Sequence, residues 1–404
     1  MQEGTSVSEN RMFGAIDAAT MLAQTESWAA INSGTANMAG LARMAQQLAD
    51  AFSELPGDVS LEEPAPVSAV APDGAIEEKP HGRHLVVRVR PDAPRRLILT
   101  GHMDTVYPVD HPFRALTWLD ADTLNGPGTA DMKGGIAVML AALKALEASG
   151  DVGAIGYDVM INSDEETGSL SSAPLISRLA QGKYAALTYE PAALPDGTLA
   201  HARAGSGNYS VTVTGRSAHA GRNPQDGRNA IVAASRLAIA LKALEHPGLS
   251  VNPARIDGGS GNNVVPDHAV LRFNIRPRSS EAGEAFQREF TALVGAISSE
   301  LDVVLSVHGG ITRPPKPVDK RAQKLFDLVK ACGAQLNQTI GWRDSGGVCD
   351  GNNIAACGVP VVDTMGVRGG SIHSPDEYMI VSSLAERAAL SALVLHRLAS
   401  GDPL

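Results

Sequence analysis

Five side chains with metal-binding atoms occur in order along most of the chain. They are two histidines and three carboxylates: His102, Asp131, Glu166, Glu190 and His373. Imidazole nitrogens and carboxylate oxygens together suit divalent ions of the zinc type. Two neighbouring ions of this type activate water and polarise a carbonyl group, so the set points to hydrolysis.

Each of the five residues lies in a short and distinctive stretch. The stretches are residues 101–106 (GHMDTV), 126–135 (GPGTADMKGG), 164–168 (DEETG), 189–191 (YEP) and 373–377 (HSPDE). The glycines around Asp131 allow the backbone to turn tightly and to approach another segment. Taken alone, Asp131 has a simpler interpretation as the cap of the helix that follows it.

Asp104 stands two residues after His102, just beyond a strand-like run. The two side chains therefore face the same way. A metal-binding histidine needs a partner on its second ring nitrogen to fix its tautomer and orientation, and Asp104 suits that role. The alternative is a strand-end histidine beside a turn aspartate.

Glu165 and Glu166 are adjacent, so in a turn after a strand they point in different directions. One can bind metal while the other faces the substrate as a general base, which is the division that a metal-assisted hydrolase needs. The alternative is an acidic loop that is simply solvated.

The composition narrows the class of protein. The chain has 404 residues, is 44% hydrophobic and carries a net charge of −10. Such a chain is long enough for two domains and a large core, and its charge argues against nucleic acid or an anionic membrane as a partner. The first nineteen residues lack the basic region of a signal peptide, and no run reaches the roughly 18 apolar residues of a membrane span. Three cysteines without CxxC spacing favour a reduced, cytoplasmic protein.

The first part of the chain predicts alternating strands and helices. The predicted helices are Asn37 to about Leu55 and Lys133–Ala148, and the predicted strands are His84–Val89, Leu97–Thr100 and Tyr157–Asn162. This order is typical of an α/β sheet covered on both faces. Because ligands bind beyond the carboxyl ends of such strands, the ends near His102 and Glu165 predict a shared site.

The segment from about Gly205 to Thr312 has a different pattern. It predicts a strand around Tyr209–Val213, a helix at Asn229–Glu245, strands at Ala254–Asp257 and Ala269–Ile275, a helix around Phe286–Ile297 and a strand at Val303–Val307. The order β-α-β-β-α-β is the ferredoxin-like arrangement. We therefore expect a catalytic domain in two parts, residues 1–204 and 316–404, with a smaller domain inserted at 205–315. Helices at about Lys320–Cys332 and Val381–Leu398 and a strand at Val359–Asp363 complete the main sheet.

Taken together, the stretches resemble the zinc aminoacylase/carboxypeptidase family. This family includes acetylornithine deacetylase, succinyl-diaminopimelate desuccinylase and bacterial glutamate carboxypeptidase, and the chain is most similar to the last. The motifs occur in family order over about residues 28–380. The resemblance implies an α/β/α zinc-peptidase domain with an inserted ferredoxin-like dimerisation domain.

The resemblance also implies roles for the motif residues. Asp131 would bridge two zinc ions, with His102 and Glu190 completing one site and Glu166 and His373 the other. Glu165 would be the general base, and Asp104 would orient His102. The peptide bond after the bridging aspartate is often cis in the family, so the bond from Asp131 to Met132 is expected to be cis.

In the inserted domain, residues 215–221 (GRSAHAG) look like the family's dimerisation motif. The resemblance implies that His219 reaches the developing oxyanion of the substrate, typically in the partner subunit. It also makes Asn263, Arg276 and Arg313 candidates for holding a substrate carboxylate, with Arg313 placed after the last strand of the domain. The alternatives are a histidine held in a turn and arginines in surface ion pairs.

The expected protein is a homodimeric, cytoplasmic hydrolase with two zinc ions, although cobalt or manganese suits the same ligands. Its expected substrates are N-acyl amino acids or small peptides with a free C-terminal carboxylate. Within the family, the alternative is a deacylase of the acetylornithine or succinyl-diaminopimelate type. Outside it, the alternatives are a binding or scaffold protein and a phosphodiesterase, for which no phosphate-binding loop is found. Cys349 is interpreted as a small packing residue.

Overall fold

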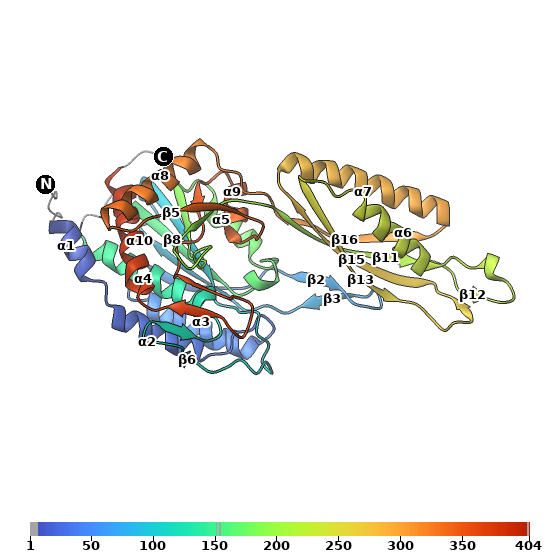
Figure 1. Cartoon of the computed structure of the whole chain (residues 1–404), viewed down its shortest axis with the longest axis horizontal. Coiled ribbons are helices and arrows are strands. Elements are labelled where there is room, and N and C mark those ends of the chain that lie inside the picture. Colours follow the sequence, from blue (N-terminus) through green and yellow to red (C-terminus); the bar gives the residue numbers. More distant parts are fainter. Residues whose placement is uncertain (1–6, 151, 153–154, 402–403) are drawn as a thin grey trace.

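The computed structural model describes residues 7–150, 152, 155–401 and 404. The chain forms two bodies placed side by side (Figure 1). The larger contains both described ends of the chain, and the smaller is built from the middle of the sequence, as expected.

The larger body is built on a six-stranded sheet. In spatial order its strands are β1 (Asp58–Glu62), β4 (His84–Val89), β8 (Ile155–Asn162), β5 (Arg95–His102), β9 (Ala185–Thr188) and β18 (Val361–Val362). The four strands from β8 to β18 pair in parallel, whereas β1–β4 and β4–β8 pair antiparallel. The carboxyl ends of β5, β8 and β9 therefore lie at one edge of the sheet, which is where the predicted ligands follow.

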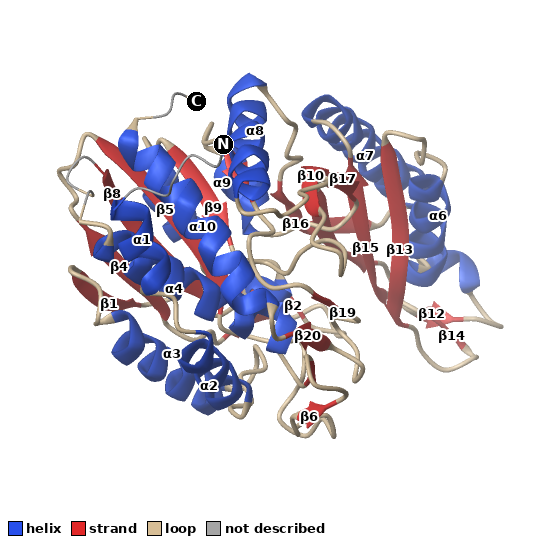
Figure 2. Ribbon diagram, turned by 60° about the vertical axis from the view of Figure 1, so that its left-hand side comes forward, coloured by secondary structure: helices blue, strands red, loops and turns tan. Residues whose placement is uncertain are grey.

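Helices cover both faces of this sheet (Figure 2). One face packs against α1 (Val7–Gly14), α2 (Ala18–Ala29), α3 (Met38–Phe52), α4 (Gly134–Ala148), α8 (Lys320–Gln335) and α10 (Ser383–Ser400). The other face packs against α5 (Ala173–Ala180) and α9 (Asp350–Ala356). Alternation along β4 explains the two cores, because Leu85 and Val87 enter the first and Val86 enters the second. The predicted α/β fold with two covered faces is confirmed.

The predicted helix near Asn37 shows how local sequence sets an element. Asn37 caps α3 by accepting a hydrogen bond from the backbone N–H of Gly40 at 3.1 Å. Leu41, Met44 and Leu48 recur at helical spacing and are buried in the core.

Shorter strands complete the larger body. They are β6 (Thr117–Trp118), β7 (Thr123–Asn125), β19 (Gly369–Gly370) and β20 (Tyr378–Ile380) in one small sheet, and β10 (Leu199–Arg203) with β17 (Trp342–Ser345) in another. The turn that carries His373 lies between β19 and β20, so this small sheet positions it.

The smaller body, called the lid domain from here on, follows the predicted order of elements. It contains β11 (Ser206–Thr214), α6 (Ala230–Lys242), β13 (Leu249–Gly258), β15 (His268–Pro277), α7 (Ser280–Leu301) and β16 (Val304–Arg313). The strands form one antiparallel sheet in the order β13-β15-β11-β16, with its own apolar core beneath α6 and α7. The ferredoxin-like arrangement is confirmed. A small pair, β12 (Ala218–His219) and β14 (Val264–Val265), lies at the far end from the larger body (Figure 1).

A hairpin of β2 (Val67–Val70) and β3 (Ile76–Lys79) extends from the larger body to the lid domain (Figure 1). Arg272 of the lid sheet donates a hydrogen bond to the backbone carbonyl of Val70 at 2.8 Å. Ser68 Oγ lies 3.3 Å from His308 Nε2 of the same sheet. The two bodies are therefore in contact along the hairpin as well as through the connecting segments.

The two segments that connect the larger body to the lid domain run side by side. Arg203 and Lys316 exchange backbone N–H···O=C hydrogen bonds of 3.0 Å in both directions. Because these residues adjoin the expected limits of the insertion, we retain the boundaries at residues 205 and 315 as a proposal. One strand was predicted too short: the last lid strand does not stop near Val307 but continues to Arg313, because its pairing with β11 continues past a register shift to Ser206.

Candidate dinuclear metal centre

The five predicted ligands come from segments that are distant in sequence and meet at one edge of the main sheet. His102 ends β5, Glu166 lies in the turn after β8, and Glu190 follows β9. Asp131 comes just before α4, and His373 lies between β19 and β20. The topology therefore gathers them at the carboxyl ends of parallel strands.

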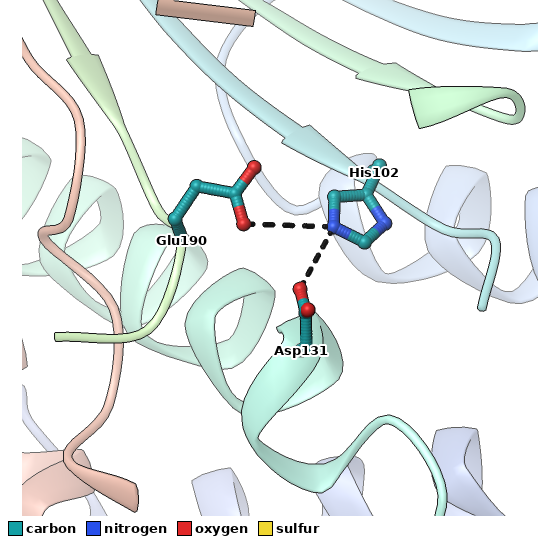
Figure 3. Close-up of side chains that lie close together, drawn as sticks. All are labelled: His102, Asp131 and Glu190. Atoms are coloured by element: carbon teal, nitrogen blue, oxygen red, sulfur yellow. Dashed lines mark hydrogen bonds and ion pairs between the residues drawn. The ribbon is translucent and has the colours of Figure 1, made fainter. Parts of the chain in front are cut away.

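Three of the ligands form a first cluster, shown in Figure 3. The Nε2 atom of His102 lies 3.0 Å from Asp131 Oδ1 and 3.7 Å from Glu190 Oε2. These three ligand atoms all lie within 4.8 Å of one another. The spacing is compatible with one shared cation.

A second cluster shares Asp131 with the first. His373 Nε2 lies 3.2 Å from Asp131 Oδ2 and 3.2 Å from Glu166 Oε2. Each oxygen of Asp131 thus faces a different cluster. A carboxylate in that position has the geometry of a bridge between two cations, and the mixed nitrogen and oxygen donors fit ions of the zinc type.

The tautomer of His102 is set by Asp104. The ring Nδ1 lies 3.0 Å from the Asp104 backbone carbonyl, which can only accept a hydrogen bond, and 3.4 Å from Asp104 Oδ1. Nδ1 therefore carries a proton, which leaves Nε2, the atom that faces Asp131 and Glu190, as the one that would bind a metal ion. The Asp104 carboxylate also accepts hydrogen bonds from Thr35 Oγ1 at 2.7 Å and from the backbone N–H groups of Glu165 and Glu166 at 3.2 Å. One buried aspartate thus aligns the histidine with the acidic turn.

Glu377 fixes the Asp131 loop, and we did not predict this role. Its buried carboxylate accepts hydrogen bonds from the backbone N–H groups of Ala130 and Asp131 at 3.1 and 3.0 Å, and from Tyr107 Oη at 2.8 Å. Glu377 belongs to the stretch at 373–377, so the motif marked it, but its type alone did not separate a ligand from a loop anchor. The peptide bond from Asp131 to Met132 is cis, as the resemblance implied.

Two backbone features bring the ligands close. Gly135 at the start of α4 lies very close to the chain just after β9. A Cβ atom at Gly135 would be 2.0 Å from the carbonyl oxygen of Tyr189. Only glycine allows this approach, which places the Asp131 loop beside Glu190. His373 has a left-handed backbone with φ of 62°, a conformation that costs energy in a residue with a side chain and is often found at functional sites.

The ionisation of the acidic groups reflects their crowding. Burial raises the pKa of Glu165 to about 7, although Arg313 opposes the shift. Burial and the charge of Asp131 raise the pKa of Glu166 to about 8. Hydrogen bonds to Asp131 and Glu166 raise the pKa of His373 to about 11. Buried carboxylates that repel one another in this way are stabilised by a bound cation.

The ligand clusters open into a cavity of about 680 Å³. Its wall includes the acidic residues Asp131 and Glu165, His373, and the arginines Arg203 and Arg343. Cys349 also lines it, but burial raises the pKa of this thiol well above its ordinary value, which disfavours a nucleophilic thiolate.

Two of the predicted residues of the lid domain, His219 and Asn263, do not line this cavity within one chain. His219 and Asn263 are exposed, and β12, which carries His219, lies at the far end of the lid domain (Figure 1). His219 Nδ1 accepts backbone hydrogen bonds from Gly221 and Arg222. Their roles at the site stay predictions.

The two predicted arginines differ in environment. Arg276 is half-buried and donates to Asn274 Oδ1 at 3.0 Å. Arg313 is buried, and its Nη1 lies 2.7 Å from Glu165 Oε1. The surface ion pair considered as the alternative is therefore excluded for Arg313, whose partner is the predicted general base.

The chain is similar in sequence to known peptidases. A peptidase dimerisation domain matches residues 201–302, and peptidase family M28 matches residues 84–191. Carboxypeptidase G2 from Pseudomonas sp. is 31% identical over 327 residues, which cover 79% of this chain and 78% of that protein. The chain belongs to the M20 metallopeptidase family.

Other M20-like relatives support the assignment. Succinyl-diaminopimelate desuccinylase 2 from Shewanella loihica is 29% identical, over 76% of this chain and 86% of that protein. Among solved structures, a tripeptidase from Staphylococcus aureus has a TM-score of 0.73 at 23% identity, covering 96% of this chain and all of that one. The aminopeptidase PepT from Bacillus cereus has a TM-score of 0.71 at 22% identity, again over 96% of this chain and all of that one. These structural matches show the shared fold.

This M20 metallopeptidase is therefore a metal-dependent hydrolase of peptide or linear amide bonds. Within the described residues, no helix is long and apolar enough to cross a membrane.

Proposed function

We propose that this M20 metallopeptidase binds two zinc ions and hydrolyses the amide bond of N-acyl amino acids or small peptides with a free C-terminal carboxylate. The observation that carries the proposal is the position of Asp131, whose two carboxylate oxygens face two separate ligand clusters. When bound, two such ions polarise a carbonyl group and lower the pKa of water.

The proposed ligand assignment follows the two clusters. Asp131 is shared, His102 and Glu190 complete one site, and Glu166 and His373 complete the other. Asp104 is proposed to orient His102, because it contacts the ring nitrogen that faces away from the cluster. Cobalt or manganese would suit the same donors.

Glu165 is proposed as the general base and acid. Its carboxylate lies on the cavity wall beside both clusters, and burial raises its pKa to about 7. A group with this pKa can accept a proton from the attacking water and then donate it to the leaving nitrogen near neutral pH.

The lid domain is proposed to act through a homodimer. The match to a peptidase dimerisation domain supports self-association, and Val232 and Ile239 leave exposed apolar surface on α6. His219 would then stabilise the developing oxyanion in the partner subunit, which is compatible with its exposed position away from the cavity of its own chain. Asn263 and Arg276 remain candidates for holding the substrate carboxylate. A cytoplasmic location is proposed on the small number of cysteines alone.

A second candidate is a deacylase of the acetylornithine or succinyl-diaminopimelate type. It is favoured by the 29% identity to a protein named succinyl-diaminopimelate desuccinylase. The two candidates use the same metal centre and differ only in the acyl group and the released amine.

The test is hydrolysis by zinc-loaded protein of a panel in which acyl group and amino acid vary independently. We expect rates that depend on the free carboxylate of the released residue and tolerate several acyl groups. Strict dependence on an acetyl or succinyl group would favour the deacylase. No hydrolysis of any member by protein with both ions bound would overturn the proposal.

A further inference from the structure

Arg313 links the lid domain to the acidic turn of the catalytic domain. It is the last residue of β16, the strand by which the chain leaves the lid sheet. Its residue surface is only 4% exposed. A guanidinium so deeply buried needs specific partners, because an unpaired charge is costly away from water.

Those partners are concentrated on Glu165. Arg313 Nη1 lies 2.7 Å from Glu165 Oε1, and Nη2 donates to the Glu165 backbone carbonyl at 3.0 Å. Nη2 also donates to Ser169 Oγ at 2.7 Å. Arg313 therefore holds both the side chain and the backbone of the turn.

A second carboxylate fixes Arg313 from the other side. Asp350 Oδ1 lies 3.6 Å from Arg313 Nη2 and accepts a hydrogen bond from Ser169 Oγ at 2.5 Å. Asp350 begins α9 and also accepts a hydrogen bond from Asn162 at the end of β8. The guanidinium is thus held between rigid elements, so it provides a fixed support for Glu165.

The cavity wall separates Arg313 from the space where a substrate would bind. Glu165 lines the cavity, whereas Arg313 is not among its lining residues. Arg343 does line it, and its side chain has no hydrogen bond or ion pair to any residue that the structure describes. A substrate carboxylate in the cavity would therefore meet Arg343, whereas Arg313 is paired with Glu165 and does not line the cavity.

We propose that Arg313 is a positioning residue that holds Glu165 from behind the cavity wall, and that it does not bind the substrate carboxylate. The inference rests on the proposed function, in which Glu165 is the general base. Because Arg313 belongs to a lid strand, the placement of the base then depends on the orientation of the lid domain.

The kinetic test uses two matched substrates, an N-acyl amino acid with a free carboxylate and its primary amide. Arg313→Gln is expected to lower kcat by about 100-fold for both, because a small misplacement of a reacting group costs that much. KM and the ratio of acid to amide turnover should stay within about twofold. Arg313→Lys should recover part of kcat, since it restores one ion pair with Glu165.

The contrary outcome is equally specific. If Arg313 bound the substrate carboxylate, Arg313→Gln would raise KM for the acid and leave the amide unaffected, and the preference for the acid would disappear. Arg255→Gln is the matched control, because Arg255 is also an ion-paired arginine of the lid sheet but does not line the cavity. It should leave both kinetic constants unchanged.

A second measurement does not depend on turnover. In metal-free protein, Arg313→Gln should speed backbone hydrogen exchange in the turn from Asp164 to Ser169 while leaving the strands of the lid sheet unchanged. Unchanged exchange in that turn would overturn the proposal. If wild-type protein hydrolysed neither substrate, the proposed function would fail, and the exchange result would still decide the role of Arg313.

Discussion

The catalytic domain and the lid domain contribute to the proposed site to very different extents. In the catalytic domain, His102, Asp131 and His373 already lie within hydrogen-bonding distance of their neighbouring ligands. In the lid domain, His219 and Asn263 are exposed, and β12 lies far from the cavity. One chain therefore brings the proposed metal ligands together, whereas the proposed role of His219 requires a partner subunit or a movement of the lid domain.

This difference follows from the helices, strands and turns in which the two groups of proposed site residues lie. Three of the proposed metal ligands, His102, Glu166 and Glu190, lie at or just after the ends of strands of a single sheet, whose hydrogen bonds fix their relative positions. The lid residues depend on the two segments that connect the bodies. Asp363 of the catalytic domain anchors both segments, since its carboxylate lies 2.7 Å from Arg203 Nε and 3.2 Å from Lys316 Nζ.

The largest effect on activity is expected at the part of the proposed site that lies in the catalytic domain. Glu165→Ala should lower turnover by roughly 100- to 10,000-fold, because it removes the group that transfers the proton. Metal content should be retained, since Glu165 is not a proposed ligand, and the fold should be retained because Asp350 and Ser169 still pair with Arg313. Steady-state kinetics and elemental analysis check both points, with the exposed Glu289→Ala as control. Near-normal turnover would remove Glu165 from its role.

The next largest effect concerns the connection between the catalytic domain and the lid domain. Burial would raise the pKa of Asp363, but Arg203 and Lys316 outweigh it and hold the pKa below its ordinary value. Asp363→Asn should therefore destabilise the fold by about 3–5 kcal/mol near neutral pH, since it leaves buried cations without their partner.

The pH dependence of this loss has a definite sign. Because the folded pKa is lowered, the Asp363 contribution is present above the unfolded pKa of about 3.9 and disappears as the pH falls through the folded value. Denaturant unfolding of both proteins at several pH values checks this. The exposed Asp327→Asn should differ from wild type by less than about 0.5 kcal/mol. Equal destabilisation by Asp363→Asn and Asp327→Asn would contradict the role of Asp363 as an anchor.

The smallest effect is a partial recovery of activity in hybrid dimers. His219→Ala and Glu165→Ala chains are each expected to be nearly inactive alone. In a hybrid, one of the two sites regains both groups, so a random mixture should show roughly a quarter of wild-type activity. No recovery in hybrids verified by native mass spectrometry would mean that His219 acts in its own subunit or not at all.

A few motif residues and short periodic segments were enough to predict the helices, the strands and the family. Strand ends at His102 and Glu165 marked one edge of the sheet, and the order of elements in the lid domain predicted its topology. These signals are local, because strand and helix periodicities appear within short windows.

The supporting contacts could not be predicted in the same way. Glu377 accepts hydrogen bonds from groups 246 to 270 residues distant, and Asp350 accepts them from groups 181 to 188 residues distant, so nothing near either residue in sequence identifies these donors. Arg313 was a candidate by resemblance to the family, but its burial against Glu165 depends on how the lid strand re-enters the catalytic domain. Side-chain roles of this kind require the packed structure.

The measurement that tests the central claim most directly is a crystal structure of active protein, with diffraction recorded at the absorption edge of its metal. We predict two ions in each chain, about 3.5–4 Å apart, with the Asp131 carboxylate between them. A fully active enzyme with one ion or none, or with Asp131 in contact with neither, would contradict the account.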